Sequence, residues 1–496
     1  VKARTRLKGY TGRPLNSWPN LVDHYRLMDT VMDKSIVTPH PIFLLTFLQS
    51  IEAGQSSQLL DSALGDYYKF LLTQSYLEVG VGKELIGQEF DYAMHLARFF
   101  NSKDTTAISR SDFVAFNDKF SRTWQEVDFS KKERLLLKTK VLIRNGDYYE
   151  FRYSYNYYYL IGRYMAKYIL DDDVQSDISK YIEHLYVKRY ANTILFLAHH
   201  ASSDNVLYLL KKAADDLFIE HPIADFNDED SIICELIRHA PHLEYSKKDP
   251  VQSRRALSEH RDTLEDSSEL EIEEEFDSTE SIDGMSKLTM LFKTIEILGE
   301  VLKSNPTSFE RFKKVDVLKS MFNAPLRALQ DFYGFLEDNP NTLIEAIEND
   351  IAKKSRDVNE SDREVFARLV VSKIIQAVSA SFIVRTAQVA NSEGLSADIP
   401  SAIEGSKALS MELIDIAISL DNYKSLDRNK ISKFHGEHKT NMLASKILNL
   451  LLINRLHLYK TSERDMQWLQ SELGYDLDAQ HKLGYRRRTK KKSLVS

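Results

Sequence analysis

The stretch VLIRNGDYYEFRYSYNYYYLIGRYMAKYI, residues 141–169, decides the predicted fold. From Tyr148 to Tyr155 aromatic residues alternate with polar ones, which is the period of a half-buried strand. The Asn-Gly-Asp sequence at 145–147 precedes this strand and favours a turn, because these residue types tolerate positive φ. We therefore predict a β-hairpin whose first strand is residues 141–144.

The period of the pattern changes after the hairpin. Between Leu160 and Tyr168 the apolar residues repeat at three and four positions, as they do in an amphipathic helix. A helix-like run at Ser130–Lys140 precedes the hairpin, and two more amphipathic helices are predicted at Glu84–Phe100 and Ser111–Trp124. Helices followed by a hairpin and a further helix form the outline of a winged helix.

The ten aromatic residues from Tyr148 to Tyr168 allow two interpretations. They can anchor a small β-wing by packing, since Tyr and Phe bury large areas. They can instead form a stacking platform for nucleic-acid bases. We favour packing, because the rings follow strand and then helix periodicity and few cations lie between them.

The composition indicates a helical protein of several domains. A length of 496 residues predicts two to four domains, and only 17 Gly and 11 Pro favour long helices over tight turns. The single cysteine, Cys234, excludes an intrachain disulfide and a cysteine zinc cluster, and it fits a reducing cytosol. We see no run of about 18 apolar residues, so we expect a cytoplasmic protein that does not span a membrane.

The formal net charge of −7 is unevenly distributed. The segment Glu265–Asp283 holds ten acidic residues and no Lys or Arg, and without it the rest of the chain carries +3. No global basic field therefore attracts the protein to nucleic acid. Low apolar content and like charge predict a disordered or loosely helical tether over Pro241–Gly284, with a charged helix over Ser253–Glu275 as the alternative.

The predicted fold class is mainly α. We expect the C-terminal body to have a long helix broken near Pro325, and stacking of its helix pairs into a solenoid is left open. The predicted domains are a helical lid-like domain (1–83), the winged helix (84–170), a helical connector (171–244), a charged linker (245–284), the helical C-terminal body (285–480) and a basic tail (481–496).

The motifs that suggest catalysis fail on inspection. Gly80–Lys83 looks like a phosphate loop, but a P-loop needs glycine at position 77, which is Leu77, and Ser or Thr after the lysine, where Glu84 stands. The adjacent His199–His200 pair cannot easily share a metal ion, because neighbours on a helix point about 100° apart. His435–His438 resembles part of a zinc deaminase motif, but the cysteine ligands of that motif are absent.

Two further patterns support weaker hypotheses. Arg428 and His435 have the loose spacing of the catalytic pair in HEPN ribonucleases, although such a spacing often arises by chance. The tail Arg486–Lys492 is basic and suits phosphates or an anionic surface, although a solvated terminus is more common.

Two motifs resemble those of STAND NTPases of the NACHT and NB-ARC type. Thr38–Leu45 resembles the proline-led helix in the lid of that family, where the proline packs on the adenine of ATP or ADP. Pro41 is the matching position. Phe151–Tyr164 resembles the family's winged-helix motif, in which Phe-Arg-His is followed after a short gap by Glu-Tyr-Leu-Ala-Ala.

The second motif departs from the family at two positions. Tyr159 matches the family's tyrosine, whereas Tyr158 stands at the glutamate position. Tyr153 stands where the family carries a histidine that senses the nucleotide phosphate. A tyrosine can donate one hydrogen bond, but it carries no charge.

The resemblance implies the regulatory and sensor portion of a STAND-type signalling ATPase, a family that often serves bacterial anti-phage defence. It implies that ATP or ADP binds mainly outside this chain, that P-loop and effector domains lie upstream, and that these residues contain no catalytic site. A protein trigger on the helical body and self-oligomerisation in the active state are expected partners. The alternatives are a winged-helix nucleic-acid-binding protein with a helical dimerisation body, and a HEPN-like ribonuclease.

Overall fold

The computed structural model describes residues 63–201, 203–229, 231–238, 252–253, 256, 283–304, 306–354, 360–392, 394–421, 426–459 and 461–473. Pro41, most of the predicted lid and linker, and the basic tail at 481–496 lie outside the described residues.

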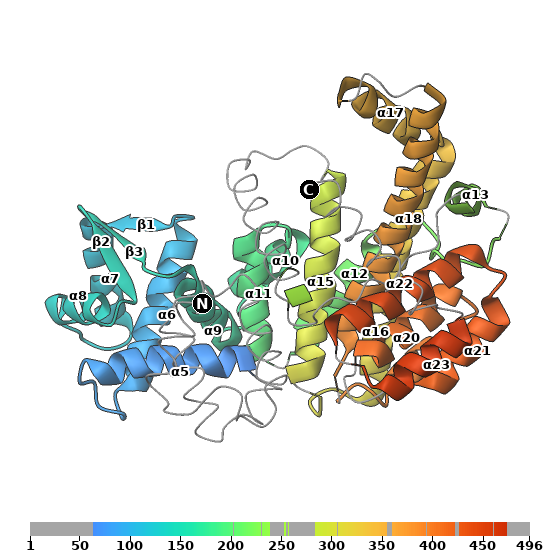
Figure 1. The fold of residues 1–496 in the computed structure, drawn as a ribbon. Helices are drawn as coiled ribbons and strands as arrows, with labels where there is room; N and C mark the ends of the chain where they lie inside the picture. The colour runs from blue at the N-terminus through green and yellow to red at the C-terminus, as the bar shows by residue number, and fades with distance from the viewer. Residues whose placement is uncertain are drawn as a thin grey trace, which may run out of the picture. The chain divides into compact units, whose positions relative to one another are not determined.

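The chain forms two compact units (Figure 1). Among the described residues, the first unit contains 63–210 and 283–309, and the second contains 211–238 and 310–473. Both units are mainly helical, and the strands of the described part form a single small antiparallel sheet in the first unit. The predicted fold class, mainly α with a short β-hairpin, is confirmed.

The sheet-containing part of the first unit has the order helix, strand, helix, helix, hairpin. Its elements are α6 (Ile86–Ser102), β1 (Ala107–Ser109), α7 (Arg110–Thr123), α8 (Phe129–Lys138), β2 (Leu142–Asn145) and β3 (Tyr148–Phe151). The strand order is β1-β3-β2, with Asn145 paired to Tyr148 across the hairpin. Gly146 has a φ of +62° in the turn, which a glycine adopts without steric cost. The predicted hairpin is therefore confirmed.

The second hairpin strand ends earlier than predicted. It stops at Phe151 instead of Tyr155, and helix α9 (Ser154–Lys167) begins three residues later. Arg152 still donates its N–H to the Val141 carbonyl at 3.0 Å, and Tyr153 is the extended N-cap residue of α9. Tyr155 continues the alternating pattern in the sequence, although it is buried as a residue of the helix. The stretch from Arg152 to Tyr155 is too short to distinguish the two-residue period of a strand from the period of a helix.

Helix α9 forms the centre of the first unit. It packs against α6, against α5 (Ala63–Glu78) and most closely against α11 (Lys188–His200). Buried aromatic rings fill these contacts, namely Tyr68, Phe90, Tyr155, Tyr158, Tyr159 and Phe196. The hypothesis that the aromatic residues are mainly packing is confirmed for this cluster.

Gly162 sets the distance between α9 and α11. A Cβ atom on this residue would lie 2.8 Å from the Cβ of Phe196 and 2.9 Å from the backbone nitrogen of Leu197. Both atoms belong to the backbone or its first side-chain carbon, so they cannot rotate away. Only glycine allows the two helices to approach this closely.

We expect Gly162→Ala to lower the free energy of unfolding of the first unit by about 1–3 kcal/mol, because the added methyl group forces α9 and α11 apart. Thermal and urea unfolding followed by circular dichroism would measure this. Gly334→Ala is the matched control, because Gly334 also lies inside a helix but has open space around its Cβ position. It should be neutral or stabilising by up to about 1 kcal/mol. Equal effects of the two substitutions would contradict the argument.

The sequence Ser176–Tyr190 predicts one helix, but this prediction is wrong, because the chain breaks between α10 (Asp172–Glu183) and α11. The rings of Tyr181 and Tyr190 stack with their centroids 4.1 Å apart. In one continuous helix nine residues would separate them by about 13.5 Å along the axis, so the contact requires the turn. The unit also includes α12 (Asp204–Asp216) in part and α15 (Gly284–Ser304), which packs on α11.

The second unit is a bundle built around one long helix. Its elements are α13 (Ile232–Arg238), α16 (Arg311–Asp338), α17 (Thr342–Lys354), α18 (Glu360–Ala390), α19 (Ile399–Ile403), α20 (Leu409–Asp421), α21 (Arg428–His438), α22 (Met442–Leu458) and α23 (Glu463–Leu473). Helix α18 contacts α13, α16, α17, α20 and α22. Figure 1 shows α17 and one end of α18 extending beyond the other helices of this unit.

The predicted break near Pro325 is wrong, because α16 runs without interruption through this residue. Proline removes one backbone hydrogen bond and usually kinks a helix. Here the neighbouring carbonyl of Leu326 accepts from the N–H of Ala224 at 3.0 Å, and Arg327 donates to three carbonyls at the end of α12, those of Ala214, Asp215 and Leu217. The helix is therefore anchored by tertiary bonds directly after the proline.

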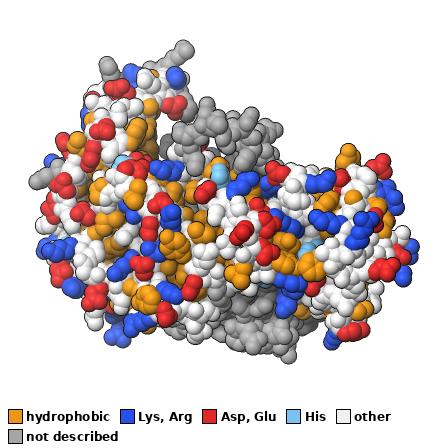
Figure 2. All heavy atoms as spheres, turned by 180° about the vertical axis from the view of Figure 1, so that it is seen from behind, with side chains coloured by type: hydrophobic (Ala, Val, Ile, Leu, Met, Phe, Trp, Pro, Cys, Tyr) orange, Lys and Arg blue, Asp and Glu red, His pale blue; other side chains and the backbone are white. Residues whose placement is uncertain are grey.

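Helix α18 is long and apolar enough to cross a membrane by length and composition, contrary to our reading of the sequence. The core helix of a globular unit passes the same test, and half of its most apolar window is buried here. Ser379 on its buried side pairs with Tyr333 of α16 at 2.6 Å. Figure 2 shows hydrophobic side chains interspersed with acidic and basic ones on the face it draws. We interpret α18 as a core helix.

Candidate functional site

The N-terminal end of α9 holds the position that the family resemblance assigns to phosphate sensing. Tyr153 is the N-cap residue, and its side chain does not cap the helix. Its half-buried ring stacks on Tyr155 with centroids 5.2 Å apart and planes inclined by 11°. The exposed guanidinium of Arg152 lies 5.4 Å from the centroid of the Tyr153 ring.

This end of α9 offers several hydrogen-bond donors for an anion. The first N–H groups of a helix lack intrahelical acceptors, and the helix dipole favours negative charge there. Arg152 adds an exposed positive charge, and the Tyr153 phenol adds a hydroxyl group. The arrangement suits binding of a phosphate.

A column of aromatic rings connects Tyr153 to two other helices. Tyr155 contacts Tyr68 of α5 at 5.1 Å between centroids, and Tyr68 contacts Phe196 of α11 edge-on at 5.0 Å. Tyr68, Tyr155 and Phe196 are buried. A movement of Tyr153 therefore has to be accommodated by α5 and α11, because close-packed rings leave little free space.

The other two motif positions are structural. Tyr159 is fully buried, with its ring 6.1 Å from Phe90 and 4.7 Å from His200. Tyr158, at the family's glutamate position, is also buried and contacts the ring of Tyr157. The motif therefore supplies one half-exposed residue, Tyr153, and two residues of the core.

In a comparison with known protein families, one family matches the part of the chain that contains this site. Residues 106–161 match the family described as Novel STAND NTPase 4, from the start of β1 to the middle of α9. We call residues 106–161 the STAND-related segment, because they are similar to that family. No curated protein and no solved structure matches the chain.

The STAND-related segment contains Tyr153 and the whole hairpin. The second predicted site residue, Pro41, lies outside both the matched residues and the described ones. Of the two predicted site residues, only Tyr153 therefore has a described environment.

Gly80–Lys83, just before the STAND-related segment, caps helix α5. Gly80 has a φ of +87°, its N–H donates to the Leu77 carbonyl at 3.0 Å, and the Val81 N–H donates to the Tyr76 carbonyl at 3.1 Å. This pair of bonds is a Schellman motif, which satisfies the last carbonyls of a helix. Gly80 therefore serves as the C-cap glycine of α5.

His200 is a neutral residue at the end of α11. Its pKa is lowered to about 3, mainly by burial and also by the nearby positive charge of Arg163 and the adjacent His199. Its Nε2 atom is buried and has no hydrogen-bond partner among the described residues. The described part of the chain contains no group of three or more His, Cys, Asp or Glu side chains placed to hold a metal ion.

A second ring cluster surrounds His95 on the surface of the STAND-related segment and α6. The imidazole lies 4.9 Å from Trp124 and 5.7 Å from Tyr168, and the Trp124 side chain is 56% exposed. Burial lowers the pKa of His95 to about 4, and the nearby Lys167 acts in the same direction. This histidine is neutral at pH 7.

Helix α8 contributes a largely buried ion pair that the sequence does not reveal. Lys132 Nζ lies 2.6 Å from Glu89 Oε2 of α6, and each side chain is 13% exposed. The ammonium group also lies 5.1 Å from the centroid of Tyr92. Next to it, the Tyr149 hydroxyl donates to the carboxylate of Glu133. These contacts attach α8 to α6 and to the hairpin.

In the second unit, Arg428 has a structural partner. Its Nε and Nη2 atoms donate to Oδ1 of Asp465 at 3.0 and 2.6 Å, and its guanidinium lies 5.5 Å from the centroid of Trp468. The residue joins α21 to α23. His435 lies two turns further along α21. Because the Arg428 guanidinium is bonded to Asp465, the structure does not favour the ribonuclease hypothesis.

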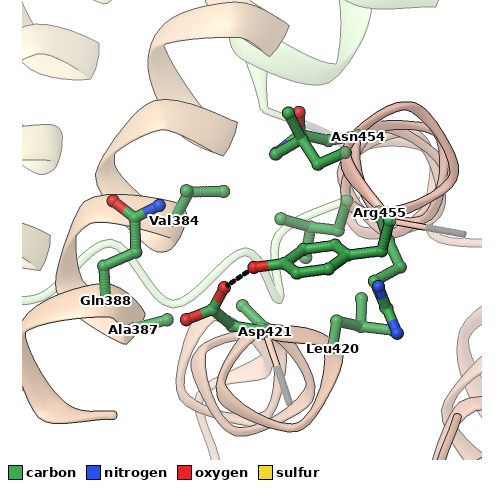
Figure 3. Close-up of a pocket in the computed structure, with 11 residues that line it drawn as sticks. Val384, Ala387, Gln388, Leu420, Asp421, Asn454 and Arg455 are labelled. Atoms are coloured by element: carbon green, nitrogen blue, oxygen red, sulfur yellow. Dashed lines mark hydrogen bonds between the residues drawn. The ribbon is translucent and has the colours of Figure 1, made fainter. Parts of the chain in front are cut away.

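A pocket lies between α18, α20 and α22 (Figure 3). Asp421 accepts from the Tyr459 hydroxyl at 2.6 Å and from Asn391 Nδ2 at 2.7 Å, so both of its oxygens are bonded. Arg455 is 6% exposed, with its guanidinium 4.1 Å from the Tyr459 centroid. No sequence motif points to this pocket, because helices far apart in the chain supply its lining.

Proposed function

We propose that this chain is the regulatory and sensor portion of a nucleotide-switched, STAND-type signalling protein of the NACHT or NB-ARC kind. The family match at residues 106–161 is the observation that carries the proposal. The matched residues include β1, α7, α8, β2 and β3. Together with the preceding helix α6 they follow a helix, strand, helix, helix, hairpin order with strand order β1-β3-β2. That arrangement supports a winged helix over residues 84–170.

In this proposal the winged helix closes over a nucleotide bound mainly by a P-loop core outside these residues. Tyr153 donates a hydrogen bond to a phosphate of ADP or ATP, assisted by Arg152 and the N-terminal end of α9. Pro41 packs on the adenine. Arg152 supplies the positive charge that a histidine at position 153 would carry.

Switching requires two arrangements of the winged helix with different affinities for the nucleotide. The ring column from Tyr153 to Phe196 supports such coupling, because a displaced tyrosine disturbs α5 and α11. The helical body binds a protein trigger, and the activated protein self-oligomerises. We place this activity in the cytoplasm, with anti-phage defence as its proposed setting.

The role of Tyr153 is tested by ADP binding to the protein with its P-loop core present. We expect Tyr153→Phe to weaken ADP binding about two- to tenfold, the value of one hydrogen bond of 0.5–1.5 kcal/mol. Tyr153→Ala should weaken it further, because the ring that orders the hydroxyl is lost. Isothermal titration calorimetry measures both affinities. Tyr148→Phe is the matched control, because that tyrosine lies on the hairpin with 55% exposure.

Unchanged ADP affinity in Tyr153→Phe and Tyr153→Ala would remove Tyr153 from the proposal. Turnover of ATP by these 496 residues alone would overturn the placement of the P-loop core outside them. The coding sequence upstream of Val1 offers an independent check, because a P-loop motif in the same frame is expected there.

A further inference from the structure

Helix α8 presents a row of cations to solvent. Successive residues of an α-helix are about 100° apart, so Lys131, Arg134 and Lys138 fall within about 60° of one another. All three side chains are exposed. Their separation along the axis, from the first to the last, is about 10.5 Å.

The acidic residue within α8 lies on another face. Glu133 is at least about 100° away from each member of the row, and its carboxylate accepts the hydrogen bond of Tyr149. Lys132 is also turned inward, where it pairs with Glu89. The apparent interruption of the basic sequence by Glu133 is therefore absent from the exposed face.

The row is available to a ligand. Within the described part of the chain, Lys131, Arg134 and Lys138 form no ion pair with a carboxylate. Two more exposed cations follow, Lys140 directly before the hairpin and Arg144 on β2. Arg144 donates from Nε to the Gly146 carbonyl at 2.8 Å and makes a loose contact with Asp147 at 3.4 Å. The cations extend from α8 onto the hairpin.

We propose that this surface, defined by Lys131, Arg134, Lys138, Lys140 and Arg144, binds the phosphate backbone of double-stranded nucleic acid. The B-DNA major groove is about 12 Å wide and admits an α-helix, and cations spread over about 10 Å can reach phosphates on its edges. Lysines act as point charges, so the binding should depend little on sequence. This inference goes beyond the nucleotide switch and uses other residues of the first unit.

The surface suits nucleic acid better than a membrane. A helix that lies on a membrane inserts large apolar side chains beside its basic ones. The leucines of α8 at positions 135–137 are buried or half-buried, and α8 contributes none of the exposed large hydrophobic residues of the described chain. The overall charge of −7 opposes long-range attraction, so we expect binding that weakens steeply with salt.

The test measures fluorescence anisotropy of a 20-base-pair duplex titrated with the full 496-residue chain, from 50 to 200 mM salt. The triple variant Lys131→Ala, Arg134→Ala, Lys138→Ala should bind at least about tenfold more weakly at 50 mM. Its plot of log K against log salt should be shallower by about 2 to 3, since each phosphate contact contributes about 0.9.

The matched control is Lys319→Ala, Lys373→Ala, Lys433→Ala, which removes the same charge from exposed positions of α16, α18 and α21. Its plot of log K against log salt should have the same slope as that of the unmodified chain. Both variants replace exposed side chains, and circular dichroism should show an unchanged unfolding midpoint. No duplex binding by the unmodified chain at 50 mM salt, an equal loss in the control, or binding to vesicles of anionic lipid instead of the duplex would overturn the proposal.

Discussion

Lowering the pH from 7 to 4 should destabilise the first unit by about 3 kcal/mol through His200 alone. The pKa of this histidine is about 3 in the folded protein, against an ordinary value near 6.5 in the unfolded chain. Below pH 6.5 the unfolded chain takes up a proton that the folded unit excludes. Each pH unit across this window changes the free energy of unfolding by about 1.4 kcal/mol.

The surroundings of His200 explain the direction of the shift. Burial is the main cause, and the positive charges of Arg163, His199 and Lys69 add to it. The ring of Tyr159 lies against the imidazole, 4.7 Å between centroids, so there is little room for water. The stabilisation is complete above pH 6.5 and is lost as the pH falls toward 3.

Urea unfolding at half-unit steps between pH 7 and pH 4 measures this dependence. His200→Leu should flatten it by about 3 kcal/mol over the range, even if the variant is less stable at pH 7. His184→Gln is the control, because its imidazole lies at the exposed end of α10 against the Lys180 carbonyl. An unchanged pH slope in His200→Leu would show that another group causes acid unfolding.

Removing Glu89 alone should cost about 3 kcal/mol or more. Glu89→Leu would leave the ammonium group of Lys132 largely buried without its carboxylate, and breaking such a pair from one side typically costs 3–5 kcal/mol. The double variant Glu89→Leu, Lys132→Leu should recover most of this loss, since two apolar side chains of similar volume leave no charge behind. Chemical unfolding of Glu89→Leu, Lys132→Leu and the double variant gives the coupling energy.

An exposed pair on the same domain supplies the comparison. Asp147→Ala removes the partner of Arg144 on the hairpin, where the carboxylate is almost fully exposed, and should cost less than about 1 kcal/mol. If Glu89→Leu cost no more than Asp147→Ala, Lys132 would have to reach water when its partner is removed. That result would contradict the buried character of the pair.

The sequence predicts those parts of the fold that depend on local patterns. The hairpin turn at Gly146 and the amphipathic helices α6 and α8 follow from turn chemistry and periodicity. The errors occur where distant residues decide. The turn after Glu183 allows Tyr181 to stack on Tyr190. Helix α16 continues through Pro325, and the two residues after the proline bond to Ala224 and to the end of α12.

The candidate site shows the same division. The motif resemblance indicates Tyr153, but the stacking on Tyr155 and the column to Phe196 require the packing of α5 and α11. The basic row on α8 is hard to recognise in the sequence, because Glu133 stands between Lys132 and Arg134. In the structure Glu133 points to another side of the helix and bonds to Tyr149, 16 residues further along the chain. A ligand at the exposed face therefore meets only the cations.

The contact between Trp124 and His95 gives the first unit an optical signal of its own. Indole emission falls when a protonated imidazole lies against the ring, and here the two rings are 4.9 Å apart. Because the pKa of His95 is about 4, the emission stays bright through neutral pH and dims only in acid. The other described tryptophan, Trp468, belongs to the second unit. With Trp18 and Trp468 replaced by phenylalanine, one fluorophore would report nucleotide or duplex binding at the first unit without an attached dye.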